Sequence, residues 1–216
     1  MKSVVKTTRP RGRPPKDADP APMKDVLQAA LRSFAKHGFN GVSVRTLNSE
    51  LGVSHNLLHQ RYGSKEGIWR AAVDWGFGHL TTKLEAADDE SAPPLDRLRA
   101  FIRTFVYVSA EHPELLRLMN IEGGEASGRL DYISERFIEP QMARFQQIWQ
   151  ELTERGEVKE DVAFEVMFYL ITSGGGAMYA GRALTERLFG NGALDPWRHA
   201  AYAEQFTNLI LDAVVK

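Results

Sequence analysis

Cysteine is absent from the 216-residue chain, which excludes disulfide bonds, cysteine-ligated metal sites and cysteine nucleophiles. Long hydrophobic runs are absent as well. The longest uncharged stretch in the apolar C-terminal half, residues 166–181, has 16 residues, and a helix of that length is shorter than the ~30 Å hydrocarbon core of a membrane. Residues 1–22 lack the apolar segment of a secretion signal. We therefore expect a cytoplasmic protein without a membrane span.

Charge is distributed unevenly, although the formal net charge at pH 7 is only −1. Six of the 27 basic residues lie within residues 1–16, which contain no acidic residue. The remaining 200 residues carry 21 basic and 28 acidic side chains, a net charge of −7. Five of the ten prolines fall within residues 1–22, as is typical of a disordered segment. We expect a disordered basic arm that attracts a polyanion to one end of an acidic body.

Helical signals begin directly after this arm. From Met23 onward the apolar residues recur at the spacing of an amphipathic helix, and Gly38 is placed to end it. Ser43 and Ser54 are N-cap candidates for two short helices, with Gly52 in the turn between them. Two short helices joined by such a turn form the helix-turn-helix arrangement.

Helical patterns continue to the C-terminus, and no segment keeps the alternating pattern of a strand. Ser64 is placed to cap a long fourth helix. Helices are expected over residues 64–88, 95–111, 113–122, 127–154, 161–188 and 196–216. The sequence therefore predicts an all-α fold.

The basic arm contains the sequence Pro10-Arg11-Gly12-Arg13-Pro14, which matches the core of an AT-hook. Glycine lets an extended backbone enter a narrow minor groove, and the flanking arginines follow the negative potential along its floor. The other interpretation is a basic tail that contributes only its charge. Both interpretations predict contact with DNA.

The third helix, residues 54–62, is the candidate recognition helix, whose N-terminal residues face base edges in a helix-turn-helix complex. An asparagine at position 56 can pair with adenine, and Leu57 can contact a thymine methyl group. The residues better placed for phosphates are Ser43, Arg45 and Lys65, together with His59 or Tyr62. Leu58 is expected in the core between the helices. The complete set expected at DNA is Arg11, Gly12, Arg13, Ser43, Arg45, Ser54, His55, Asn56, Leu57, His59, Gln60, Tyr62 and Lys65.

Residues 23–72 resemble the N-terminal domain of the tetracycline-repressor (TetR) family. The residues that carry the resemblance are Ala30, Phe34, Gly38-Phe39, Ser43-Val44, Leu51-Gly52-Val53-Ser54, His59-Gln60-Arg61-Tyr62 and Ser64-Lys65-Glu66. The chain departs from the family at Leu47-Asn48, where the family usually has Ile-Ala. It also departs at His59 and Tyr62, where the family usually has Tyr and Phe.

The resemblance implies a homodimeric transcriptional regulator, a repressor that binds a palindromic operator in double-stranded DNA and is released by a small-molecule effector. It divides the chain into the arm (1–22), a helix-turn-helix DNA-binding domain (23–70) and a ligand-binding and dimerisation domain (71–216). The long fourth helix would join the last two. Dimer contacts are expected from residues 161–188 and 196–215, as a four-helix bundle. The glycines at 174–176 and 181 would let the two backbones approach closely.

The effector pocket is expected among the central helices, between Trp69 and Tyr169. This region is dense in aromatic residues and methionine, which suits an apolar ligand with one or two hydrogen-bonding groups. The candidate ligand-binding residues are Trp75, Phe105, Met119, Glu122, Phe137, Trp149 and Tyr169.

No pattern in the sequence indicates an enzyme. Gly76-Phe77-Gly78 and Gly63-Ser64-Lys65 lack the remaining glycines and the preceding strand of nucleotide-binding loops. We expect no catalytic residues, no cofactor and no metal. Two alternatives stay open: a nucleoid-associated protein that binds DNA through its arm with little sequence preference, and a ligand-binding helical protein or enzyme with an incidental basic tail.

Overall fold

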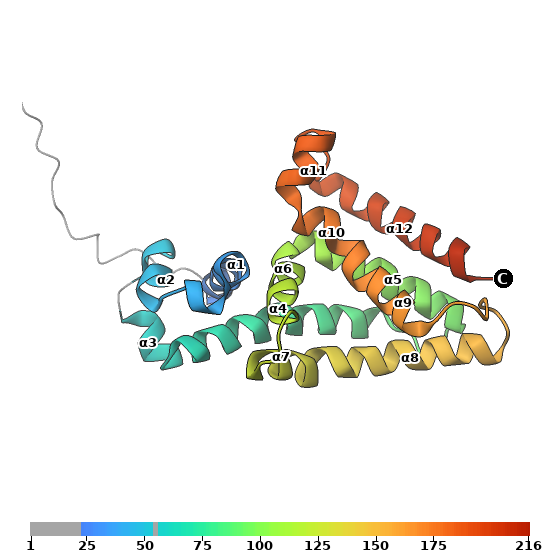
Figure 1. Cartoon of the computed structure of the whole chain (residues 1–216), viewed down its shortest axis with the longest axis horizontal. Coiled ribbons are helices and arrows are strands. Elements are labelled where there is room, and N and C mark those ends of the chain that lie inside the picture. Colours follow the sequence, from blue (N-terminus) through green and yellow to red (C-terminus); the bar gives the residue numbers. More distant parts are fainter. Residues whose placement is uncertain (1–22, 54–55) are drawn as a thin grey trace, which may run out of the picture.

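The computed structural model describes residues 23–53 and 56–216. Within these residues the regular structure is helical apart from an isolated antiparallel bridge between Val158 and Val215, so the predicted all-α fold is confirmed. The N-terminal helices are α1 (Met23–Gly41), α2 (Val44–Glu50), α3 (Leu57–Tyr62) and α4 (Lys65–Ala87). Figure 1 shows α1, α2 and α3 at one end of the molecule and α4 running from them into the body.

Local sequence signals set the ends of these helices. The Ser43 hydroxyl accepts a hydrogen bond from the Thr46 N–H, and the Ser64 hydroxyl accepts one from the Gly67 N–H, each at 3.0 Å, so both predicted caps are confirmed. Gly38 has a φ of 68° and kinks α1, where a residue without a side chain adopts this conformation at little cost. The third helix begins at Leu57 rather than at Ser54, and residues 54–55 lie outside the described part.

The C-terminal part contains shorter helical pieces than the sequence predicts. They are α5 (Pro94–Glu111), α6 (Pro113–Glu122), α7 (Gly128–Ile133), η1 (Ser134–Ile138), α8 (Glu139–Glu154), α9 (Phe164–Tyr169), η2 (Leu170–Gly174), α10 (Gly175–Ala180), α11 (Arg182–Phe189), η3 (Pro196–Arg198) and α12 (His199–Val214). Both η1 and η2 are π-helical. The helix predicted over residues 161–188 is wrong as one element, because the chain leaves helical geometry at Gly181 before α11 begins.

Two hydrophobic clusters hold the described helices together. The first joins α1–α4 to α6, α7 and η1 around the fully buried side chains of Phe34 and Trp69. The second joins α5, α8, α9, η2, α10 and α12 around Phe145 and Ile148. Because the first cluster includes Leu118 and Ile133, the helix-turn-helix region shares its core with the C-terminal part, and α4 passes through that core.

The glycines of η2 and α10 serve packing within the subunit. A Cβ atom at Gly175 would lie 2.7 Å from Val106 Cγ2 on α5, and one at Gly176 would lie 2.9 Å from Leu116 Cδ2 on α6. Both glycines are buried. The expectation that they let two subunits approach is therefore wrong for Gly175 and Gly176, which instead let α10 approach its own neighbours.

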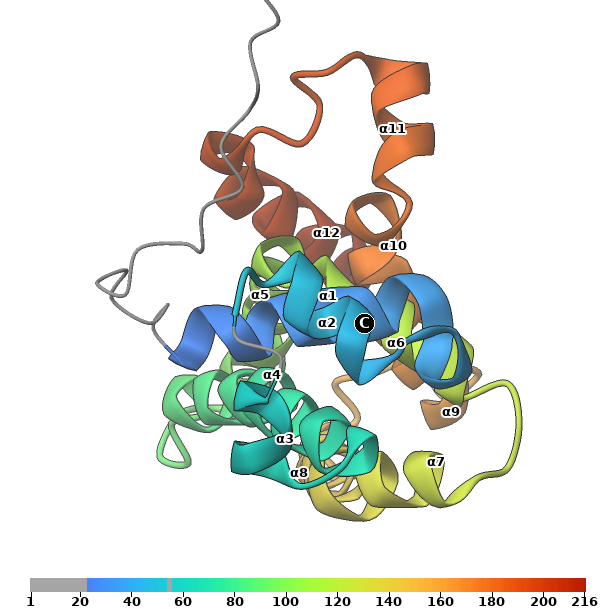
Figure 2. The same cartoon turned by 90° about the vertical axis from the view of Figure 1, so that its left-hand side faces the viewer.

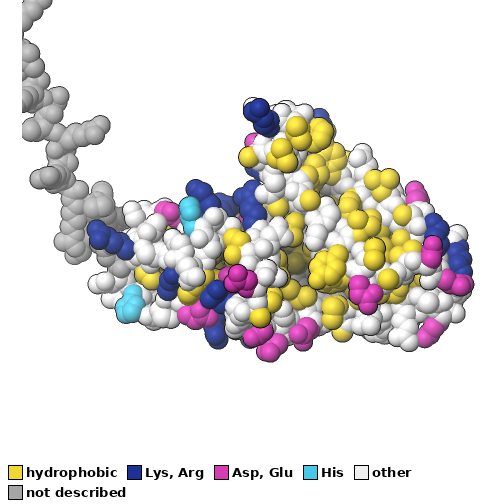
Figure 3. Space-filling view, in the orientation of Figure 1, with side chains coloured by type: hydrophobic (Ala, Val, Ile, Leu, Met, Phe, Trp, Pro, Cys, Tyr) yellow, Lys and Arg dark blue, Asp and Glu magenta, His cyan; other side chains and the backbone are white. Residues whose placement is uncertain are grey.

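Exposed apolar side chains gather on the face formed by α9, η2, α11, η3 and α12. Of the ten large exposed hydrophobic side chains among the described residues, eight lie in these elements: Val166, Tyr169, Leu170, Leu184, Leu188, Phe189, Trp197 and Leu209. Figure 3 shows hydrophobic side chains spread over this part of the surface, and Figure 1 shows α11 standing away from the rest of the body. Among residues 23–53 and 56–216, no helix has the length and apolar character to cross a membrane.

Candidate nucleic-acid interface

The α2 and α3 helices pack at the end of the molecule that Figure 2 turns toward the viewer. Leu47 on α2 and Leu58 on α3 are both 1% exposed or less, and both belong to the first hydrophobic cluster. The expected place of Leu58 in the core is therefore confirmed. Gly52, in the turn between them, has a φ of 62°. This is the geometry of a helix-turn-helix motif, with α3 as the second helix.

The predicted base-reading residues that the structure describes lie at the start and on the outer side of α3. Asn56 and Gln60 are exposed, and Leu57 is half-buried; His59, predicted for a phosphate, is also exposed on this helix. Asn56 is the residue before the helix, and its side chain makes no cap hydrogen bond. Five further residues that we expect at DNA lie outside the described residues: Arg11, Gly12, Arg13, Ser54 and His55.

The predicted phosphate-binding residues have different surroundings. Arg45 and Ser43 are exposed at the start of α2, where Ser43 also caps the helix. Tyr62 is half-buried, and its hydroxyl donates a hydrogen bond to Met23 Sδ at 3.0 Å, so its polar end is engaged within the subunit. Lys65 begins α4, and its Nζ atom lies 4.3 Å from the centre of the Phe39 ring.

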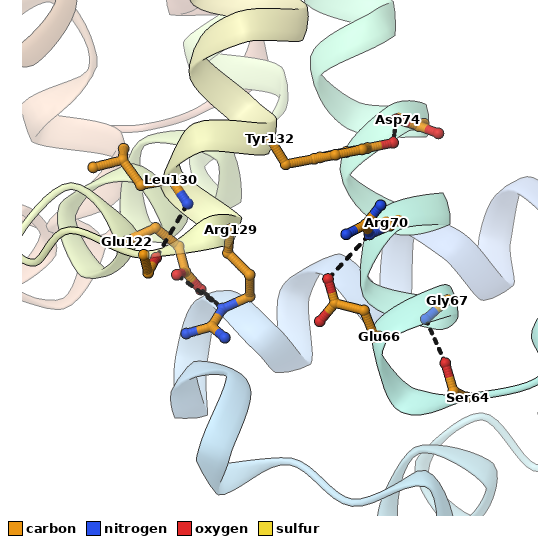
Figure 4. Close-up of polar contacts among 10 residues, drawn as sticks. Ser64, Glu66, Gly67, Arg70, Asp74, Glu122, Arg129, Leu130 and Tyr132 are labelled. Carbon is orange, nitrogen blue, oxygen red and sulfur yellow. Dashed lines mark hydrogen bonds and ion pairs between the residues drawn. The ribbon is translucent and has the colours of Figure 1, made fainter.

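A layer of polar contacts lies behind this surface, between α4, α6 and α7. Arg129 donates hydrogen bonds from Nε to both carboxylate oxygens of Glu122, at 3.1 and 3.0 Å. The Tyr132 hydroxyl donates a hydrogen bond to Asp74 on α4 at 2.7 Å, and desolvation and this bond raise the pKa of Tyr132. Figure 4 shows both pairs, with Arg129 pointing toward Glu122 and Tyr132 toward Asp74. Glu122, a predicted effector ligand, is therefore engaged by an arginine.

The other predicted effector residues are divided between the two hydrophobic clusters and an exposed position. Trp75, Met119 and Phe137 pack on the first hydrophobic cluster, whereas Phe105 and Trp149 belong to the second. The remaining residue, Tyr169, is 67% exposed on α9. A common pocket for these residues stays a prediction.

The described residues also enclose a cavity elsewhere, between α4, α5 and α12. It has a volume of about 520 Å³ and is open to one side, within the size range of ligand sites. Its charged lining residues are Lys83, Arg103, Glu111 and Glu204. This cavity is more polar than the apolar pocket predicted from the sequence.

Contacts between distant segments have no signal in the sequence pattern. Nothing in the local sequence links Phe39 to Arg129, although the Arg129 guanidinium lies 4.5 Å from the centre of the Phe39 ring. The only local signal is Phe39 itself, an aromatic residue directly after Gly38, where α1 is kinked.

Two family models match the chain and together cover most of it. Residues 26–72 match the model described as bacterial regulatory proteins, tetR family. Residues 94–210 match a model described as a tetracyclin repressor-like C-terminal domain.

Curated relatives are transcriptional regulators. The chain is 32% identical over 119 residues to the HTH-type transcriptional regulator RutR of Escherichia coli K12. The aligned residues make up 55% of this chain and 54% of RutR. It is 26% identical over 148 residues to the HTH-type transcriptional repressor SCO4008 of Streptomyces coelicolor. Here the aligned residues make up 68% of this chain and 72% of the relative. The match thus spans about half the length of RutR.

Solved structures share the fold over nearly the whole chain. The ketosteroid transcriptional regulator KstR2 of Mycobacterium tuberculosis has a TM-score of 0.72 at 18% identity, with 91% of this chain and 96% of the other covered. The transcriptional regulator FadR from Bacillus subtilis has a TM-score of 0.62 at 16% identity, covering 88% and 97%. At identities this low, the likeness to these structures shows a shared fold alone.

Proposed function

We propose that this chain, which belongs to the TetR family of bacterial regulatory proteins, is a homodimeric, sequence-specific DNA-binding transcriptional regulator. We take it to be a cytoplasmic repressor that a small effector releases from its operator. Residues 23–70 bind DNA, and residues 71–216 bind the effector and the partner subunit. The observation that carries the proposal is the helix-turn-helix motif, with Asn56 exposed directly before α3, Gln60 exposed on α3 and a lysine at the start of α4.

Base reading is assigned to α3 and phosphate binding to its surroundings. Asparagine and glutamine both pair with adenine through two hydrogen bonds in the major groove. Lys65, Ser43 and Arg45 fix the orientation of the protein without reading sequence. The basic arm adds a second contact through Arg11, Gly12 and Arg13, which lie beyond the described residues.

Dimerisation is assigned to the apolar face of α9, η2 and α12, which α11 extends. A surface with side chains as exposed as Tyr169 at 67% and Leu209 at 69% is typical of a site that another protein covers. A two-fold axis through this face would present two α3 helices to half-sites about one turn of DNA apart, ~34–36 Å.

A binding-site selection from random duplex DNA tests the proposal. A single enriched palindrome is the result expected for a dimeric regulator. Retention of DNA without an enriched motif would instead support the nucleoid-associated alternative. No retention at physiological salt would contradict both and favour a ligand-binding protein or enzyme.

The effector is proposed to be a small, largely apolar molecule. The same fold holds stearoyl-CoA in FadR from Bacillus subtilis, so this architecture can admit an apolar chain. In this chain, Trp75 is half-buried beside the His112 ring, with ring centres 5.5 Å apart, and it lies on α4, which continues from the DNA-binding end.

Quenching of tryptophan fluorescence by fatty acids and fatty acyl thioesters tests this assignment. We expect a quenching ligand to lower DNA affinity, and Trp75→Phe to remove a large share of the signal. A ligand shifts the DNA-binding equilibrium only if it prefers the state that does not bind DNA. Quenching with unchanged DNA affinity would therefore contradict the effector role.

A further inference from the structure

A buried ion pair anchors the start of α7. The Glu122 side chain at the end of α6 is 3% exposed, and that of Arg129 is 27% exposed. Both carboxylate oxygens accept hydrogen bonds from Arg129 Nε. A buried carboxylate needs such a cation, because its loss would leave an uncompensated charge in the interior. Glu122 therefore fixes where the Arg129 guanidinium lies.

The same guanidinium contacts the DNA-binding end of the molecule. It lies 4.5 Å from the centre of the Phe39 ring, and Lys65 Nζ lies 4.3 Å from the same ring centre. Phe39 itself stacks on Phe34, with ring centres 6.0 Å apart and planes 13° apart. Arg129, from the predicted effector-binding part, and Lys65, from the predicted phosphate-binding site, thus both contact the ring of Phe39.

The helix that carries Arg129 also touches α4 near its start. Tyr132, one turn later on α7, lies with its ring centre 6.0 Å from that of Trp69 and donates its hydroxyl hydrogen bond to Asp74. The guanidinium of Arg70 lies 4.7 Å from the centre of the Tyr132 ring. A displacement of α7 would therefore change the contacts that Phe39 and the first turns of α4 make with it.

We propose that Arg129 is a positioning residue for DNA binding, which holds Phe39, and through it Lys65, in place for a phosphate. The inference rests on the proposed function and deepens it, because it names a contact from the effector-binding part that sets the DNA-binding surface. Lys65 has a long, flexible side chain, and holding such a side chain in place reduces the entropy lost when it binds.

Amine labelling tests the contact without DNA. The variant Glu122→Gln/Arg129→Ala removes both charges, so that no buried carboxylate is left without its cation. We expect Lys65 in this variant to react about two- to fivefold faster relative to the exposed Lys36, the factor that corresponds to one part-exposed cation–π contact. Arg129→Lys keeps a cation for Phe39 and should restore most of the wild-type rate.

The matched control is Arg136→Ala. Arg136 follows α7, is 59% exposed, and contacts Asp74 and the Tyr132 ring rather than Phe39. Its removal should leave the Lys65 labelling rate unchanged. An unchanged rate in the Glu122→Gln/Arg129→Ala variant would overturn the proposal.

A double-mutant cycle on the selected duplex tests the effect on DNA binding. The Glu122→Gln/Arg129→Ala variant should bind about two- to fivefold more weakly, and the effect should vanish in a Lys65→Ala background, because both changes act through one phosphate contact. Additive losses, or no loss, would overturn the inference while the proposed function stands. A wild type that retains no duplex would overturn the proposed function and the inference with it.

Discussion

Lys65 is the residue at which the assignment to a DNA phosphate, rather than to a base edge, can be tested. It begins α4, where the free N–H groups of a helix N-terminus also attract anions, and its ammonium group contacts the Phe39 ring. We predict that Lys65→Ala weakens binding to all duplexes about equally and lowers the slope of log affinity against log salt by ~0.9 per subunit. Lys36→Ala, exposed on α1, should leave the slope unchanged. A changed base preference in the Lys65→Ala variant would contradict the assignment.

Single residues were predictable from the sequence where their role is local. Ser43 and Ser64 are caps because a serine hydroxyl reaches an N–H group three residues on, a relation that the sequence itself contains. The pairing of Arg129 with Phe39 was not predictable, because it depends on how α7 returns to the end of α1. Glu122 was expected to bind an effector, and only the fold reveals its partner Arg129.

Between α4 and α5, an ion pair is expected to stabilise the turn. Arg97 donates hydrogen bonds to both oxygens of Asp88, at 2.8 and 3.1 Å, and the two side chains are 8% and 12% exposed. The hydrogen bond from Arg97 is the main cause that holds the pKa of Asp88 below its ordinary value. Asp88→Asn leaves Arg97 buried without this partner, so we predict a loss of about 3 kcal/mol in the free energy of unfolding at pH 7.

The pH dependence follows from the same shift. A carboxyl group with a lowered pKa in the folded state stabilises the protein above its unfolded pKa of ~3.9 and loses that contribution as the pH falls through the folded value. The difference between wild type and Asp88→Asn should be constant from pH 7 to about pH 5 and shrink below about pH 4. Denaturant unfolding at each pH measures it, with the exposed Glu90→Gln as control. A difference that grows in acid would contradict the account.

Helix ends were predictable where a proline or a cap marks them, as at Pro113 and Ser64. Interruptions inside long helical patterns were not. The chain leaves helical geometry at Gly181, and π-helical segments interrupt the patterns around Ser134–Ile138 and Leu170–Gly174. These breaks place Gly175 and Gly176 against α5 and α6. They depend on packing between elements, which hydrophobic periodicity does not contain.

At the scale of the whole molecule, the exposed apolar face predicts how two subunits meet. Tyr169 on α9 and Leu209 on α12 are the positions to alter, because their exposure means that a charge there costs the isolated subunit little. We predict that Tyr169→Glu/Leu209→Glu yields folded monomers with weakened binding to the palindrome. Sedimentation velocity measures the mass, and Tyr107→Glu, at an exposed position on α5, is the control. Dimers that persist in the double variant would contradict the assigned interface.

The central claim is that two copies of α3, related by a two-fold axis, read DNA bases. Binding-site selection performed in parallel on the wild type and on the Asn56→Ala and Gln60→Ala variants tests it most directly. For the wild type we predict one palindrome. Each variant should lose preference at the same position in both half-sites, at a cost of about 1–3 kcal/mol per base contact. A motif that is identical in the wild type and both variants, or one without two-fold symmetry, would contradict the account.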